Sequence, residues 1–220
     1  TTSTASLVAQ CLFTGITSAE TCVYLDGPNT LSACSFVDNA VQLARFNEYS
    51  TQQFVVQDCV FENNTFDSLN NMIEAKQYGQ FLNCLFRNNF CSRYLLWTRR
   101  DVSLLNTSFE SNTTLLWLIY IDAINNAVDQ CILAGNTRGI YSDYNPTVSN
   151  THFCENNDED IQGAYTDGGG NVFLAVCGDV EGACCVDDVC YEVEQFFCDS
   201  VGGEWLGFNA ICQEDTCAPQ

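Results

Sequence analysis

The segment Asp58-Cys-Val-Phe-Glu-Asn-Asn64 sets the architecture of this chain, because it returns 25 residues later as Asn83-Cys-Leu-Phe-Arg-Asn-Asn89. Extending the search in both directions finds seven copies of one pattern, each with a small anchor residue. The anchors are Cys11, Cys34, Cys59, Cys84, Thr107, Cys131 and Thr151. Successive anchors lie 23, 25, 25, 23, 24 and 20 residues apart, a period typical of one coil of a solenoid.

Two other positions of the repeat are apolar in every copy. Three residues before the anchors stand Val8, Leu31, Val56, Phe81, Leu104, Val128 and Val148. Two residues after them stand Phe13, Phe36, Phe61, Phe86, Phe109, Leu133 and Phe153. Alternate residues of a strand share a face, so each anchor and its second neighbour are predicted to stack in columns inside the solenoid. The earlier apolar residue reaches the same interior if the chain bends at the polar residue just before the anchor.

Asparagine recurs five residues after the anchor in six of the seven copies. The first copy has Ile16 there, and the others have Asn39, Asn64, Asn89, Asn112, Asn136 and Asn156. Asparagine tolerates the left-handed backbone that a sharp turn needs, and its amide can bond to the amide of the next coil. The pattern predicts an asparagine ladder along one edge of the stack.

A second apolar stretch follows each turn, so every coil is expected to hold at least two strands. These stretches are residues 41–44, 72–75, 94–97, 115–121 and 140–141, and the chain near Ile161. Corresponding strands run in the same direction, which predicts parallel sheets. An antiparallel sandwich would instead show turns every 8 to 12 residues or so. We therefore expect an all-β chain, with a parallel β-helix of about seven coils of 20–25 residues over residues 1–176.

The columns and the ladder resemble those of the right-handed parallel β-helix proteins of the pectin-lyase-like superfamily. The resemblance covers roughly residues 5–175 and implies a right-handed coil. It implies little about activity, because the superfamily includes lyases, hydrolases, phage tailspikes, adhesins and non-enzymatic surface proteins.

Fifteen cysteines in 220 residues indicate an exported protein. Residues 177–220 lack the repeat and are predicted to form a separate cysteine-rich module that disulfides stabilise. Six of its cysteines can form three bridges in fifteen possible connectivities, which the sequence leaves open. They are Cys184, Cys185, Cys190, Cys198, Cys212 and Cys217. This module is expected to cap the open end of the solenoid.

The other cysteines fall into two groups. Cys34, Cys59 and Cys84 lie in the anchor column, where parallel side chains point the same way, so we expect buried free thiols. Four cysteines lie off that column and are candidates for local bridges: Cys22, Cys91, Cys154 and Cys177.

The charge of the chain is strongly negative. Seven Lys and Arg stand against 28 Asp and Glu, giving a net charge of −21, which excludes nucleic acid as a partner. Four acids near the last coil are weak candidates for calcium ligands, Glu155, Asp158, Glu159 and Asp160; no other cofactor is expected. The longest apolar run, residues 115–121, is too short for a membrane span, so we interpret the chain as a secreted protein without its signal peptide.

Catalytic signals are weak, and no catalytic residue is predicted. The single histidine, His152, is expected on the outer surface. The best alternative for polysaccharide chemistry is Arg99-Arg100-Asp101 with Trp97 and Asp122. Outward aromatic side chains could instead bind sugars without turnover, namely Trp97, Trp117, Tyr120 and Tyr144. N-glycosylation sequons begin at Asn63, Asn106 and Asn112.

These observations favour a non-catalytic extracellular structural or adhesive protein that assembles with copies of itself in a fibre or surface layer. The alternatives are a carbohydrate-active enzyme and a carbohydrate-binding module, whose partners would be glycans.

Overall fold

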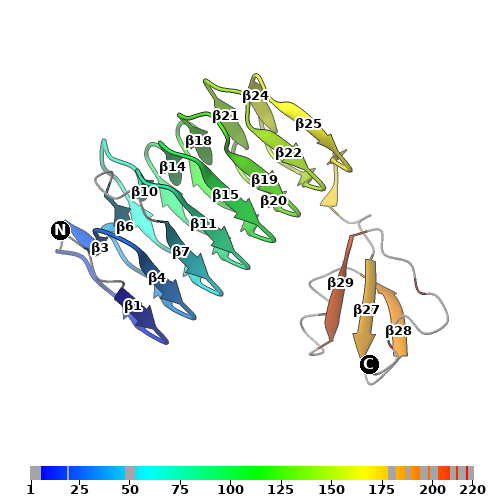
Figure 1. Ribbon diagram of the computed structural model, residues 1–220, viewed down its shortest axis with the longest axis horizontal. Helices are drawn as coiled ribbons and strands as arrows, with labels where there is room; N and C mark the ends of the chain where they lie inside the picture. Colours follow the sequence, from blue (N-terminus) through cyan, green and yellow to red (C-terminus); the bar gives the residue numbers. More distant parts are fainter. Residues whose placement is uncertain are drawn as a thin grey trace. The chain divides into compact units, whose positions relative to one another are not determined.

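The structure is a computed structural model that describes residues 6–18, 20–47, 53–177, 182–186, 189–193 and 203–208, with the single positions 198, 212 and 217. The chain divides into two compact units, Thr1–Ala175 and Val176–Gln220. The first is a parallel β-solenoid of about seven turns, as the repeat predicts (Figure 1). Within the described residues, no helix has the length and apolar character needed to cross a bilayer.

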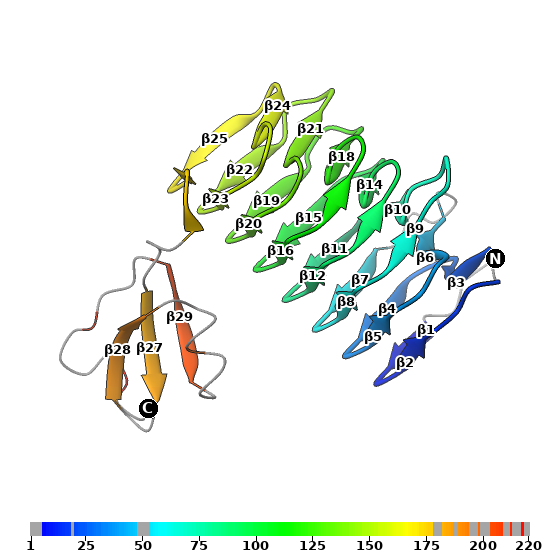
Figure 2. The same ribbon diagram turned by 180° about the vertical axis from the view of Figure 1, so that it is seen from behind.

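Successive coils build three parallel sheets, which we call A, B and C; sheets A and B have eight strands each and sheet C has seven. Sheet A consists of β1 (Ser6–Ala9), β4 (Asn29–Ser32), β7 (Phe54–Gln57), β11 (Gly79–Leu82), β15 (Val102–Leu105), β19 (Ala127–Asp129), β22 (Thr147–Ser149) and β25 (Thr166–Gly169). Sheet B, visible in Figure 2, consists of β2 (Leu12–Thr14), β5 (Ser35–Val37), β8 (Val60–Glu62), β12 (Leu85–Arg87), β16 (Ser108–Glu110), β20 (Ile132–Ala134), β23 (His152–Cys154) and β26 (Val172–Leu174).

Sheet C holds the second apolar stretch of each repeat. It consists of β3 (Thr21–Leu25), β6 (Gln42–Phe46), β10 (Ile73–Ala75), β14 (Leu96–Thr98), β18 (Ile119–Ile121), β21 (Ile140–Ser142) and β24 (Ile161–Gly163). In three middle coils a short additional strand precedes it, and these strands form sheet D: β9 (Thr65–Phe66), β13 (Phe90–Cys91) and β17 (Thr113–Thr114).

Left-handed residues make the two sharp turns of the repeat. The residue before each anchor has a positive φ, from 48° at Asn106 to 54° at Gln10, and it separates the strand of sheet A from that of sheet B. The second turn is made by the residue four after the anchor, for example Asn63 with φ of 54°. The ladder asparagines, one residue later, do not have positive φ. The expectation that they supply the left-handed turn is therefore wrong; their role lies in the side chain.

The ladder amides bond from coil to coil. Asn64 Nδ2 donates to Asn89 Oδ1 at 2.9 Å and to the Phe36 carbonyl at 2.8 Å, and Asn89 Oδ1 also accepts the Asn64 backbone N–H at 3.0 Å. The same bonds continue to Asn156, whose Nδ2 donates to Asp160 Oδ1 at 2.7 Å. Five of the six amides are at least 99% buried. Since a buried polar group is stable only with partners, the ladder fixes the coils in register.

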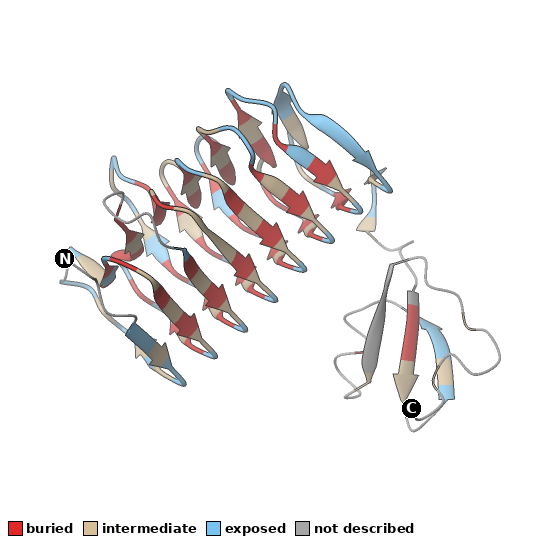
Figure 3. Ribbon diagram, in the orientation of Figure 1, coloured by how far each residue is buried: buried red, intermediate tan, exposed pale blue. Residues whose placement is uncertain are grey.

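A phenylalanine column fills the interior beside the ladder. Neighbouring rings from Phe13 to Phe109 stack with centroids 4.6–4.9 Å apart and planes within 11°. Leu133 continues the column, and Phe153 stacks on Phe173 at 4.9 Å. Figure 3 shows the buried residues along the central strands, whereas β25 in the last coil is exposed.

The anchor column is a row of thiols and hydroxyls. Cys34, Cys59 and Cys84 are buried free thiols, and each donates to a backbone carbonyl, as Cys59 Sγ does to Gln57 at 3.2 Å. The expectation of local bridges is wrong for Cys22 and Cys91, which are also free. Cys91 lies in sheet D between Phe66 and Thr114, so its neighbours along the stack offer no sulfur.

This arrangement predicts which thiols react in the folded protein. We expect alkylation at neutral pH to modify Cys11 first, because it is partly exposed, and to spare five buried thiols: Cys34, Cys59, Cys84, Cys91 and Cys131. Cys22 should react slowly, because burial raises its pKa to about 11. Burial also raises the pKa of Cys131, to about 12. Mass spectrometry before and after denaturation measures this order. Rapid modification of the column thiols in the native state would contradict the stack.

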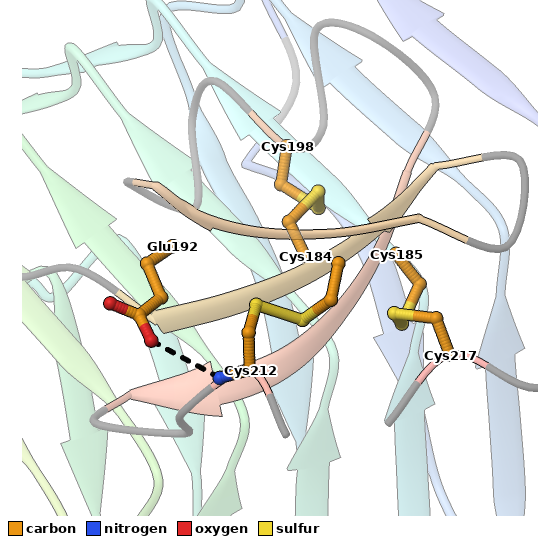
Figure 4. Close-up of a disulfide and its surroundings, with 7 residues drawn as sticks. Cys184, Cys185, Glu192, Cys198, Cys212 and Cys217 are labelled. Carbon is orange, nitrogen blue, oxygen red and sulfur yellow. Dashed lines mark hydrogen bonds between the residues drawn. A yellow bond between two sulfur atoms is a disulfide. The ribbon is translucent and has the colours of Figure 1, made fainter. Parts of the chain in front are cut away.

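The second unit contains a three-stranded antiparallel sheet with the order β28 (Val189–Val193), β27 (Gly182–Val186), β29 (Glu204–Phe208). Three disulfides join cysteines of β27 and β28 to cysteines further along the chain: Cys184–Cys198, Cys185–Cys217 and Cys190–Cys212. The Cys212 N–H also donates to Glu192 Oε1 at 3.2 Å (Figure 4). Cys154 and Cys177 are each disulfide-bonded as well. Several disulfides indicate an oxidising environment.

Candidate functional site on the outer face of sheet C

One residue of each sheet C strand lies on the outer face of the sheet, since side chains alternate between the two faces of a strand. Register pairing aligns these residues as one row, Tyr24, Arg45, Glu74, Trp97, Tyr120, Tyr141 and Gln162. In this row Trp97 and Tyr120 stack at 6.5 Å, and Tyr120 and Tyr141 lie 5.5 Å apart. The face therefore combines large rings with charged side chains.

Most of the basic residues of the protein lie against aromatic rings, and Arg45, Lys76 and Arg99 lie over rings of this row. Six of the seven basic residues lie over an aromatic ring, at 5.1–5.9 Å from its centroid: Arg45, Lys76, Arg93, Arg99, Arg100 and Arg138. The seventh, Arg87, pairs with Glu62 on sheet B. Cation–π contacts of this kind are favourable. The aromatic rings therefore stabilise these basic side chains.

Carboxylates balance these cations. Glu74 is only 5% exposed and pairs with Lys76 at 2.8 Å and with Arg45 at 3.4 Å. Asp143 accepts a hydrogen bond from Tyr120, and another from Tyr141 at 3.0 Å. Burial and the bond to Asp143 raise the pKa of Tyr120, and the bond to Asp143 is the main cause that raises the pKa of Tyr141. Both phenols therefore remain neutral donors.

The ring faces in the row are largely occupied. Lys76 and Arg99 lie over Trp97, and Tyr120 stacks beside it. Trp117 is only 9% exposed, because Arg138 lies over its ring, so it offers no open ring face. A sugar that stacks on an aromatic ring needs an open face. Of the four aromatic residues that the sequence singles out, Tyr144 is the most exposed, at 43%.

An open pocket of about 450 Å³ lies where the chain passes from sheet C to sheet A. Its lining includes Tyr78, Arg99, Arg100, Asp101, Asp122 and Tyr144. The fold thus brings together the arginines and aspartates that the sequence proposes for polysaccharide chemistry. Trp97 does not line the pocket but contacts Arg99 at 5.6 Å. Guanidinium donors beside carboxylate acceptors suit the hydroxyls of a polar ligand.

The calcium candidates do not form a ligand cluster. Asp158 pairs with Arg138 at 2.7 Å, and Asp160 accepts the last ladder amide. Glu155 and Glu159 are exposed. Among the residues that the structure describes, no three acidic, histidine or cysteine side chains are arranged to hold a metal.

The three sequons differ in access. Asn63 and Asn106 are exposed, and Asn106 Nδ2 donates to Asn83 Oδ1 at 3.0 Å. Asn112 is 1% exposed, and its Nδ2 donates to Asn136 Oδ1 and to the Phe86 carbonyl. Asn112 therefore cannot carry a sugar in this fold.

His152 is buried rather than on the surface, with 3% exposure, so that expectation is wrong. It aligns with Ile132 and Val172 on the outer side of sheet B. Burial lowers its pKa, because a charged imidazole loses hydration.

The lowered pKa predicts a loss of stability in acid. Below the ordinary imidazole value of about 6.5, the unfolded chain takes up the proton before the folded one, so stability falls as the pH decreases toward the folded pKa. Each unit of lowering is equivalent to about 1.4 kcal/mol. When the pH is lowered from 7.5 to 5.5, the melting temperature of the wild type should fall more than that of His152→Gln. Equal falls would contradict the prediction, and the chain has no other histidine to confuse the comparison.

No protein-family model matches the chain, and a search of curated proteins finds no match either.

Proposed function

We propose that this protein is a non-catalytic extracellular structural or adhesive subunit that associates with copies of itself in a fibre or surface layer. The observation that carries the proposal is a pair of largely exposed leucines in β1 and β2, Leu7 at 69% and Leu12 at 66%. Large exposed apolar side chains are typical of association surfaces.

The architecture supports a mechanical rather than a catalytic role. The ladder and the phenylalanine column tie each coil to the next, which makes the solenoid a rigid scaffold. The same features support a right-handed coil and a place in the pectin-lyase-like superfamily. The disulfides support secretion, since such bonds persist in oxidising compartments.

Electron microscopy and size-exclusion chromatography of the purified protein, with and without calcium, test this function. Large regular assemblies at physiological salt are the expected result. A monomer in both buffers at every concentration tested would reject self-association as the main role.

The pocket beside sheet C favours a second candidate, which is binding or turnover of a glycan. Its support is that Arg99, Arg100, Asp101 and Asp122 line one pocket together with Tyr144, which is 43% exposed. Binding of immobilised polysaccharides that the double variant Arg99→Ala/Arg100→Ala abolishes would favour this candidate. Arg87→Ala, on sheet B, is the matched control. Release of reducing sugar would separate an enzyme from a binding module.

A further inference from the structure

Four consecutive coils place a cysteine at the anchor position, and their thiols form a row inside the solenoid. The row consists of Cys11, Cys34, Cys59 and Cys84. The residues that follow these cysteines pair in register, as Val60 does with Ser35 and Leu85, so each cysteine lies directly beside the next. Neighbouring strands of a sheet are about 4.8 Å apart, and the row repeats at this spacing.

The thiols of Cys34, Cys59 and Cys84 occupy equivalent positions. Each lies 3.2–3.4 Å from the carbonyl oxygen of the residue two before it, and 3.5–3.6 Å from a carbonyl oxygen of the preceding coil. Equivalent side chains keep their sulfur atoms about one strand spacing apart, whereas a disulfide joins sulfurs at about 2.05 Å. The row is therefore reduced in a chain in which eight other cysteines are disulfide-bonded.

The same spacing suits a metal ion that takes two sulfur ligands in a straight line. A bond between a metal and a thiolate is about 2.3 Å long, so two such bonds in line span about 4.6 Å. Thiolates select soft cations such as Cu(I), and Ag(I) has the same preference. A structural zinc site needs four ligands, and the described part of the chain arranges no three candidate side chains around a metal. The row fits a two-coordinate soft cation instead.

Cys59 and Cys84 are hydrogen-bonded to each other through their thiols. This bond lowers the pKa of Cys59 and raises the pKa of Cys84, and burial raises the pKa of Cys84 further. Cys59 is therefore the thiol of the pair that gives up its proton first. A monovalent cation held by one thiolate and one thiol is neutral as a unit, which avoids the large cost of burying an unpaired charge.

We propose that Cys59 and Cys84 bind one soft monovalent cation, Cu(I) or Ag(I), between their sulfur atoms. One proton leaves to solvent as the two metal–sulfur bonds form, and no atom changes its oxidation state. The bound ion links the third coil to the fourth inside the core, where the two cysteines are 0% and 3% exposed. This site is independent of the proposed self-association.

The same column contains a thiol that has no thiol beside it. Cys131 lies between Thr107 and Thr151, because the residues that follow these three pair in register. Hydroxyl groups are poor ligands for soft cations, so Cys131 serves as a control. Both threonines are fully buried, which shows that threonine is tolerated at the anchor position and is the substitution of choice there.

Silver binding to the full chain tests the proposal. The parent protein carries Cys11→Thr and Cys34→Thr, so that Cys59 and Cys84 are the only neighbouring thiols left in the column. Silver(I) is added to the folded protein and, in parallel, during refolding from urea. Excess thiosulfate then removes the ions that single thiols hold. Native mass spectrometry should find one retained silver ion per chain, and X-ray absorption should show two sulfur neighbours.

The further substitutions Cys59→Thr and Cys84→Thr should each abolish retention of the ion, whereas Cys131→Thr should leave it unchanged. Thermal unfolding without silver checks that each variant folds, and either thiol variant is sufficient if the other does not. Silver should raise the melting temperature only where both thiols are present. Loss of silver from every protein, or retention after Cys59→Thr or Cys84→Thr, would overturn the proposal.

Discussion

Replacing Asn89 with alanine is expected to lower the free energy of unfolding by about 4 kcal/mol. Asn89 is 1% exposed in the middle of the ladder. Its Oδ1 accepts two bonds from Asn64, and its Nδ2 donates to Asn112 Oδ1 and to the Phe61 carbonyl. Alanine removes all four bonds and leaves buried partners unsatisfied, each at a cost of about 1–3 kcal/mol before relaxation. Urea denaturation followed by circular dichroism measures the loss.

The neighbouring residue provides the matched control. Asn88 is exposed and has φ of 54°, a conformation that glycine adopts without strain. Asn88→Gly should therefore change the free energy of unfolding by less than about 1 kcal/mol. Equal effects of the two substitutions would show that the ladder contributes no more than an ordinary turn.

The fold could be predicted from the sequence because every coil repeats the same pattern of residues that must be buried. A period of 20–25 residues, a small anchor and a phenylalanine two residues later have one arrangement that buries them all. The sequence did not predict which residue makes each sharp turn. Positions 63 and 64 are both asparagine, yet they have different roles. The backbone of Asn63 makes the left-handed turn, whereas the side chain of Asn64 donates a hydrogen bond to the next coil. Only the observed backbone assigns these roles.

The candidate site was predicted only in part. The sequence singled out Arg99, Arg100, Asp101 and Asp122, which the fold brings to one pocket. It missed the gathering of basic residues over aromatic rings, because these residues lie at different positions of different repeats. A signal was present in the second apolar stretch, where Arg45, Glu74 and Trp97 share one register position.

Burial was misjudged where strand alternation alone was used. His152 and Trp117 were expected to face solvent, yet they are 3% and 9% exposed. Alternation tells which side of a sheet a residue occupies, whereas exposure depends on what covers that side. For Trp117, the side chain of Arg138 lies over the ring at 5.4 Å and Tyr141 lies 5.7 Å from it.

Truncating Phe86 to alanine should lower the free energy of unfolding by about 3–5 kcal/mol, because it opens a cavity inside the phenylalanine column. Phe86 is fully buried, stacks between Phe61 at 4.6 Å and Phe109 at 4.7 Å, and meets the edge of Phe81 at 6.1 Å. Phe86→Leu should cost less, since Leu133 already occupies this column. Phe173→Ala is the control, because that ring is 47% exposed, and its loss should be below about 1 kcal/mol. If urea denaturation gave similar losses for Phe86→Ala and Phe173→Ala, the column would not be a continuous core, and the stability of the solenoid would have to reside in its backbone bonds and amide ladder.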